Sequence, residues 1–128
     1  MQYKPENQDL IEAIAEFLRK DILALVKDND ELAYKTLVSW NMLNVVIRDL
    51  EKEELNIIKE LERLSELLNL PLEIPLTLKE KKEKVKELNH KLCELIKNQK
   101  IHKDHPIWEH VKQTLIENLS ISNPRFTL

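Results

Sequence analysis

The chain has 128 residues, a formal net charge of −3, no glycine, five prolines and one cysteine. The missing glycine excludes Gly-rich phosphate-binding loops and dinucleotide fingerprints, and it disfavours type I′ hairpins and nucleophile elbows. An apolar share of 42% is enough for a hydrophobic core, and this length predicts one domain over residues 1–128.

The first predicted helix begins near Pro5 and ends at Lys27, since proline suits the first helical turn and apolar residues recur at three- and four-residue steps. The stripe that we expect to face the core consists of Leu10, Ile14, Phe17, Leu18, Ile22, Leu25 and Val26.

The second helical stretch follows the cap residues Asp28, Asn29 and Asp30, with Glu31 three residues after Asp28 as in a capping box. Its apolar period continues to Leu68 and is interrupted only by the polar run 51–54. An unbroken helix over 31–69 would be about 58 Å long. A compact domain of this size has a radius of gyration of only about 14 Å, so we expect a break near Lys52.

Two prolines, Pro71 and Pro75, predict a linker over residues 70–76, whose apolar residues Leu72, Ile74 and Leu76 should lie on the core. A capping box of Thr77 and Glu80 then opens a helix that ends near residues 98–100.

Asp104 is the predicted cap of a last helix with Pro106 in its first turn. The expected apolar face of this helix consists of Trp108, Val111, Leu115 and Leu119. No stretch shows the alternation typical of strands, so the predicted fold is all-α: an antiparallel helical bundle of four to five helices with a Pro-containing linker at 70–76 and a short C-terminal tail.

Charge is unevenly distributed, with 9 basic and 16 acidic residues in 1–76 and 11 basic and 7 acidic residues in 77–128. Eight lysines lie between Lys79 and Lys100, but four glutamates are interleaved with them and no aromatic residue accompanies them. This pattern is typical of a solvated helix face, so we expect no nucleic-acid partner.

A single cysteine cannot form an internal disulfide, and no apolar stretch approaches the ~20 residues that span a bilayer. The first nine residues contain no signal-like apolar run. We therefore expect a cytoplasmic protein without a membrane partner.

Reactive side chains are few. His105 and His110 would diverge by about 140° on one helix, while His90 and Cys93 share a face without a third ligand. Cys93 adjoins the apolar stripe and is expected to be a buried, unreactive thiol. The pattern predicts no catalytic residue, no metal and no cofactor.

Two short segments are the candidate interaction sites. On the second helix, Trp40, Asn41 and Arg48 combine an aromatic anchor with polar groups amid apolar neighbours. Asn41 could fix helix register, line an interface or lie in an internal pocket. The second segment is the tail Asn123, Pro124, Arg125 and Phe126, which could dock on its own domain or on a partner.

These residues also carry a resemblance. Asp9–Leu18, Trp40–Leu43 with Arg48–Leu50, Leu88–Asn89 with Leu92, and Leu119–Phe126 follow the order of motifs in a small bacterial family of uncharacterised helical domains. Members of that family tend to be encoded beside aminoglycoside-phosphotransferase-like kinases and acyl-CoA dehydrogenases. They resemble the small accessory subunit of a kinase that phosphorylates 4-hydroxyacyl-CoA thioesters. The chain departs from the family at Glu53–Glu54, where Gly-Pro is common, and around Asn41, where small residues are common.

The resemblance implies a non-catalytic accessory subunit whose partner is a kinase of the aminoglycoside-phosphotransferase type. By matching position it also points to Asn41, Arg48, Asn123, Pro124 and Arg125 as interaction residues. The alternatives are a homo-oligomeric helical scaffold and, third, a small-molecule site in the bundle core near Asn41.

Overall fold

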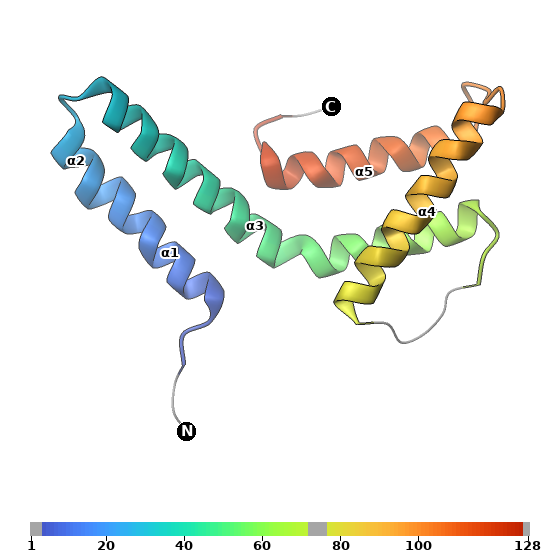
Figure 1. Ribbon diagram of the computed structural model, residues 1–128, viewed down its shortest axis with the longest axis horizontal. Helices are drawn as coiled ribbons and strands as arrows, with labels where there is room; N and C mark the ends of the chain where they lie inside the picture. The colour runs from blue at the N-terminus through green and yellow to red at the C-terminus, as the bar shows by residue number, and fades with distance from the viewer. Residues whose placement is uncertain (1–3, 72–76, 127–128) are drawn as a thin grey trace. The chain divides into compact units, whose positions relative to one another are not determined.

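The computed structural model describes residues 4–71 and 77–126, which form helices and loops with no strand (Figure 1). The helices are α1 (Asn7–Phe17), α2 (Leu23–Val26), α3 (Asp30–Leu67), α4 (Leu78–Asn98) and α5 (Pro106–Ser122), with a π-helical turn over Leu18–Ile22 joining α1 to α2. The all-α helical fold is thus confirmed. The chain divides into two compact units, Met1–Glu51 and Lys52–Leu128, which are described separately.

α3 is one uninterrupted helix of 38 residues, so the expected break near Lys52 is wrong. All residues of the polar run 51–54 are good helix formers, and no proline or glycine stops the helix there. The limit on helix length assumed one compact body, whereas residues on the two sides of position 51 belong to different compact units.

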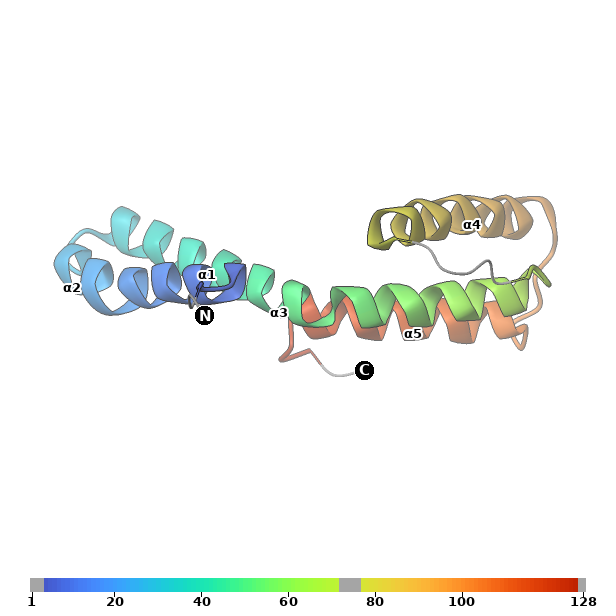
Figure 2. The ribbon, with the colours of Figure 1, turned by 90° about the horizontal axis from the view of Figure 1, so that it is seen from below.

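In the N-terminal unit, α1 and α2 lie antiparallel beside the first half of α3 (Figures 1 and 2). The turn between them is capped by Asn29, not Asp28, because Asn29 Oδ1 accepts a hydrogen bond from the amide of Leu32 at 3.1 Å. Gln8 Nε2 donates to Glu51 Oε1 at 2.9 Å, and the guanidinium carbon of Arg19 lies 5.6 Å from the centre of the Trp40 ring. These contacts tie the two arms of the hairpin together.

The two arms bury little. Ala15 is the one fully buried hydrophobic residue among the described residues of this unit. Four of the seven residues expected to face the core lie outside it, since Leu10, Ile14 and Phe17 are each 52% exposed and Leu25 is 80% exposed.

The C-terminal unit has a continuous core in which α4 packs on α3 and α5. Its buried members are Leu61, Leu64, Val85, Leu88, Leu92 and Ile107. α3 ends in a Schellman motif, in which Leu70 N–H donates to Ser65 O and Asn69 adopts φ 52°, the left-handed conformation that glycine supplies in most chains. The linker beyond Pro71 lies outside the described residues, and so do the expected core contacts of Leu72, Ile74 and Leu76.

The caps of the last two helices gave one confirmed and one wrong prediction. α4 opens with the predicted capping box, in which Thr77 Oγ1 accepts from Glu80 N–H at 3.2 Å and Glu80 Oε2 accepts from Thr77 N–H at 3.3 Å. α5 is capped by His105 instead of Asp104, because His105 Nδ1 accepts from the amide of Ile107 at 3.1 Å. Pro106 occupies the first turn as expected.

Candidate functional site

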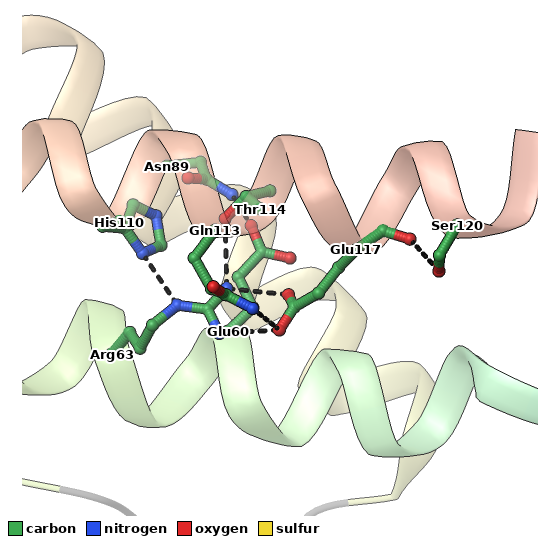
Figure 3. Close-up of polar contacts among 8 residues, drawn as sticks. All are labelled: Glu60, Arg63, Asn89, His110, Gln113, Thr114, Glu117 and Ser120. Carbon is green, nitrogen blue, oxygen red and sulfur yellow. Dashed lines mark hydrogen bonds and ion pairs between the residues drawn. The ribbon is translucent and has the colours of Figure 1, made fainter. Parts of the chain in front are cut away.

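Polar contacts surround Arg63 of α3 in the C-terminal unit (Figure 3). Its two terminal nitrogens donate to Glu117 Oε1 and Oε2 at 2.9 and 2.8 Å, and one of them also donates to Thr114 Oγ1 at 3.2 Å. The remaining nitrogen, Nε, donates to His110 Nδ1 at 3.4 Å. All three guanidinium nitrogens therefore bond to α5, and this bidentate geometry fixes α5 on α3.

We name the contacts of Arg63 with His110, Thr114 and Glu117 the Arg63 clamp. Further polar contacts follow along α5. Gln113 Nε2 donates to Glu117 Oε1 at 3.3 Å, and Ser120 Oγ donates to the carbonyl of Glu117 at 2.7 Å. Lys52 Nζ in turn donates to Ser120 Oγ at 3.4 Å. On the α4 side of α3, Asn89 Nδ2 donates to Glu60 Oε1 at 2.8 Å.

Burial and neighbouring charges shift the pKa values of His110 and Glu117 in the clamp. Burial lowers the pKa of His110, the positive charge of Arg63 lowers it further, and Glu60 and Glu117 oppose this only in part. Burial alone would raise the pKa of Glu117, but hydrogen bonds from Arg63 and Gln113, with the charges of Arg63 and Lys59, bring it below its ordinary value. At neutral pH, His110 is therefore neutral, with Nδ1 as the acceptor for Arg63, and Glu117 is ionised.

A pocket of about 590 Å³ opens beside the clamp. Its lining residues are Arg63, Glu66, Leu67, His105, Pro106, Glu109, His110 and Gln113. Nδ1 of His105 caps α5 and Nδ1 of His110 accepts from Arg63, so each histidine is engaged in a structural contact. No group of three or more His, Cys, Asp or Glu side chains within residues 4–71 and 77–126 is arranged to hold a metal ion. The arrangement of these polar groups serves to join two helices.

The N-terminal hairpin has two unlike edges, which flank the seam where α1 meets α3. Along an α-helix, the residues before and after a buried position project about 100° to either side of it. Ile14 and Glu16 flank the buried Ala15 in this way, and Val46 and Arg48 flank the half-buried Ile47. In two antiparallel helices, the residues that precede the buried positions project to the same side of the pair, and those that follow them project to the other side. Ile14 and Val46 therefore share one edge, and Glu16 and Arg48 share the opposite edge.

We name the first edge the apolar edge. Its exposed members recur at helical spacing on α1 and on α3: Leu10, Ile14, Phe17, Leu32, Val46 and Leu50. Each of the six is between 43% and 52% exposed. Isolated exposed hydrophobic residues are normal on a protein surface, but a row of six on adjoining helices is typical of an interaction surface.

The opposite edge is polar. A shallow groove of about 280 Å³ lies there, lined by Glu12, Ala15, Glu16, Arg19, Lys20, Trp40, Asn44 and Ile47. Glu16 and Lys20, one turn apart on α1, are among the lining residues and form an ion pair with each other. Trp40 is half-buried, and the guanidinium group of Arg19 lies over its indole ring. The ring therefore helps to hold α1 on α3 and is also partly accessible to solvent.

The predicted interaction residues fall in both compact units. Trp40, Asn41 and Arg48 lie on the first half of α3. Asn41 is exposed, so its side chain does not line an internal pocket of the hairpin.

The tail follows α5, where Asn123 N–H closes the helix by donating to Leu119 O at 2.8 Å. Pro124 and Arg125 are exposed, and Phe126 N–H donates to Asn123 O at 3.0 Å in a tight turn that leaves the ring of Phe126 51% exposed.

Two expectations about side-chain burial are wrong. Cys93 is exposed, because it lies about 100° around α4 from its buried neighbour Leu92, on the flank of the side that buries Val85, Leu88 and Leu92. The inward face of α5 consists of Ile107, His110, Thr114 and Glu117, whereas Trp108, Val111 and Leu115 of the predicted face are 38–47% exposed.

The sequence pattern did not reveal the Arg63 clamp, because the side of α5 that faces α3 is mostly polar. His110, Thr114 and Glu117 follow Ile107 at three- and four-residue steps, which is a helical stripe, but three of its four members are polar. A search for apolar periodicity passes over such a stripe. The partner residue, Arg63, lies 47–54 positions away in sequence, so no local pattern connects it to α5.

Residues 27–126 match the family described as Domain of unknown function (DUF6285), and the chain therefore belongs to that family. No curated protein and no solved structure shows significant similarity to the chain. The matched range includes the Arg63 clamp, α4 and the predicted residues on α3 and in the tail, whereas α1 precedes it. Within the described residues, no helix is both long enough and apolar enough to cross a bilayer.

Proposed function

We propose that this protein is a non-catalytic interaction subunit that binds a partner protein through the apolar edge of its N-terminal hairpin. The observation that supports this most directly is the incomplete burial of α1. Only one side of its apolar stripe meets α3, and Leu10, Ile14 and Phe17 on the other side remain half exposed. A two-helix hairpin with this edge needs a further layer to bury it.

The class of partner comes from the resemblance described above. Its motifs point to a kinase of the aminoglycoside-phosphotransferase type that acts on hydroxyacyl-CoA thioesters, with this chain as the small accessory subunit. Binding would favour the active or soluble conformation of the kinase through contacts made only in that conformation. Asn41, Arg48 and the tail residues Asn123–Phe126 are the further contacts that the resemblance suggests, and all four tail residues are exposed.

Co-expression of the chain with such a kinase, followed by size-exclusion chromatography and a kinase assay, tests the proposal. We expect co-elution and a kinase activity that depends on the chain. The double variant Ile14→Lys/Val46→Lys should weaken the complex at least tenfold, because two charges would have to be buried in an apolar contact. The control variant, Leu55→Lys/Leu115→Lys, adds the same charges at exposed apolar positions of the C-terminal unit and should bind normally.

Failure of the wild-type chain to co-elute, with unchanged kinase activity, would refute the proposal.

A second candidate function is the homo-oligomeric scaffold, in which the apolar edge of a second copy supplies the missing layer. Light scattering distinguishes the two, because self-association predicts a mass that rises with concentration and falls in the Ile14→Lys/Val46→Lys variant.

A further inference from the structure

The pocket beside the Arg63 clamp is lined by a buried histidine whose two ring nitrogens have different surroundings. His110 is only 4% exposed, and its Nδ1 accepts a hydrogen bond from Arg63 Nε (Figure 3). A guanidinium group can only donate, so Nδ1 of His110 carries no proton, and the proton of the neutral ring is on Nε2. His110 therefore offers one N–H group that the clamp does not use.

This N–H group has no acceptor among the described residues. It is not sealed in the core either. Of the side-chain nitrogens and oxygens on described residues that are not exposed, Asn56 Nδ2 is the one that is both fully buried and unpartnered, so His110 Nε2 reaches solvent. Because His110 lines the pocket of about 590 Å³, its small accessible surface opens there.

Arg63 also lines the pocket and has one donor to spare. A guanidinium group carries five N–H bonds, and four of those in Arg63 are used in the clamp. The fifth, on Nη1, has no acceptor among the described residues. The half-buried Leu67 and Pro106 add apolar surface to the lining. The least exposed part of the pocket thus combines N–H donors with apolar walls.

The rim of the pocket is acidic. Glu66 of α3 and Glu109 of α5 are exposed lining residues, and neither forms an ion pair with a described residue. Arg63 does not neutralise this rim, because its charge is already compensated by Glu117. Lys112 follows Glu109 by one turn, but even with its charge counted the surroundings carry no positive excess. An anionic ligand would therefore meet like charges at the rim.

We propose that this pocket binds a small uncharged molecule whose carbonyl oxygen accepts a hydrogen bond from His110 Nε2. A carbonyl oxygen has two lone pairs and can also accept the spare N–H of Arg63, while an apolar or aromatic part of the ligand packs on the apolar walls. A cation has no acceptor for the buried donor, and the acidic rim repels a carboxylate or phosphate.

The size and the place of the pocket agree with such a site. Its volume lies within the range of about 300–1,000 Å³ that is typical of small-molecule sites. All of its lining residues belong to the C-terminal compact unit, whereas the apolar edge belongs to the N-terminal unit. The inference is therefore independent of the proposed function, and each can fail without the other.

Three ligands that share a benzene ring test the proposal: benzamide is uncharged, benzoate is an anion and benzylamine is a cation. Each is titrated to about 20 mM into the nitrogen-15-labelled full-length chain near pH 7.5, and NMR follows the ring nitrogens of His110 and the backbone amides of the lining residues. We expect benzamide to shift the Nε2 signal with a dissociation constant of about 1–10 mM, as suits a ligand of this size. Benzoate should bind at least fivefold more weakly, and benzylamine should leave Nε2 unchanged.

Two variants locate the groups responsible. His110→Phe keeps a planar ring but removes the donor, and it should weaken benzamide binding at least fivefold. Glu66→Gln/Glu109→Gln removes the acidic rim at exposed positions, and it should raise the affinity for benzoate at least threefold without changing that for benzamide. The matched control is Glu83→Gln/Glu94→Gln, which changes the net charge equally at exposed positions of α4 outside the pocket and should alter neither affinity.

Several results would overturn the proposal. One is a His110 Nε2 signal that benzamide leaves unchanged or that benzylamine shifts as much; another is benzoate binding as tight as that of benzamide. Equal effects of the two glutamine pairs on benzoate binding, or normal benzamide binding by a folded His110→Phe variant, would have the same meaning. If His110→Phe does not fold, the Nε2 signal of the wild type and the two glutamine pairs decide the matter.

Discussion

At the scale of single residues, Arg63 shows how a polar side chain determines helix placement. Its guanidinium group bonds to three side chains of α5, and its side chain is only 23% exposed, that of Glu117 11%. Such a partly buried ion pair contributes little net stability against an apolar replacement, but removal of one partner leaves the other charge without compensation. Arg63 and Glu117 therefore specify how α3 and α5 face each other.

Glu117→Gln tests this role. We expect the free energy of unfolding in urea to fall by about 1–3 kcal/mol, because Arg63 loses its charged acceptor in a partly buried site. Glu87→Gln is the control, since Glu87 pairs with two lysines but is 51% exposed, and it should lower the free energy of unfolding much less than Glu117→Gln does. Equal losses in the two variants would show that the clamp adds nothing beyond a surface ion pair.

His110 makes the same site sensitive to acid. Burial and Arg63 lower the pKa of His110 relative to the unfolded chain, so the unfolded state binds the proton more readily. The stability from neutral His110 is complete above the ordinary histidine pKa near 6.5 and is lost as the pH falls through the lower pKa of the folded state. The free energy of unfolding should therefore decline from pH 7 to pH 5.

His110→Gln should flatten that decline, because glutamine keeps an acceptor for Arg63 without binding a proton. His90→Gln, at an exposed histidine of α4, should leave the decline unchanged. Urea unfolding at several pH values, followed by circular dichroism, measures both slopes. If the stability of His110→Gln declines as steeply as that of the wild type, the decline comes from carboxylates such as Glu117 and not from His110. The pKa of Glu117 is also lowered, and its stabilising effect is lost at more acidic pH.

At the scale of elements, α3 is the feature that links both compact units. Its 38 residues correspond to about 57 Å, and the helix continues through residues 51–54 although none of the four is apolar. All four are good helix formers, so intrinsic propensity favours the helix across this segment. Ion pairs of Glu53 with Lys82 and of Glu54 with Lys81 add contacts to α4 just after the boundary between the units.

Glu54→Pro tests whether this segment is helical. In an uninterrupted helix, proline removes a hydrogen bond and clashes with the preceding turn, which costs about 3 kcal/mol or more. Both substitutions remove the 4.0 Å ion pair of Glu54 with Lys81, but Glu54→Ala leaves the backbone hydrogen bonds intact. Glu54→Ala should therefore change the free energy of unfolding by less than about 0.5 kcal/mol. Helical content by circular dichroism and urea unfolding provide the measurements. A break at this position would tolerate proline as well as alanine.

At the scale of the whole molecule, the two compact units differ in how much apolar surface they bury. The C-terminal unit has a core of six buried hydrophobic residues, whereas the described part of the N-terminal unit has Ala15 alone. Local opening requires less free energy where few apolar contacts are lost. The hairpin is therefore the part of the molecule whose stability a partner can change most.

Hydrogen exchange followed by mass spectrometry tests this difference. Amides of α1 should exchange at least tenfold faster than those of the central part of α4. If the proposed function holds, a kinase partner should slow the exchange of α1 selectively. The Leu55→Lys/Leu115→Lys variant serves as the control for added surface charge. Equal protection of α1 and α4 in the isolated chain would show that the apolar edge is already covered without a partner.

The sequence by itself determined the helical class, most helix boundaries and the Thr77–Glu80 cap, because these depend on local periodicity, backbone propensity and side-chain hydrogen bonds within one turn. The predicted interaction residues Trp40, Asn41, Arg48 and 123–126 stay predictions, since exposure alone does not show what they bind.

Only the tertiary structure decided which side of each helix is buried. α1 meets α3 through Ala15 instead of the middle of its apolar stripe, and α5 meets α3 through His110, Thr114 and Glu117. The physical reason is that burial depends on the shape and hydrogen-bonding groups of the facing helix. Arg63 makes a polar stripe the better partner for α3, and no pattern within α5 records that residue.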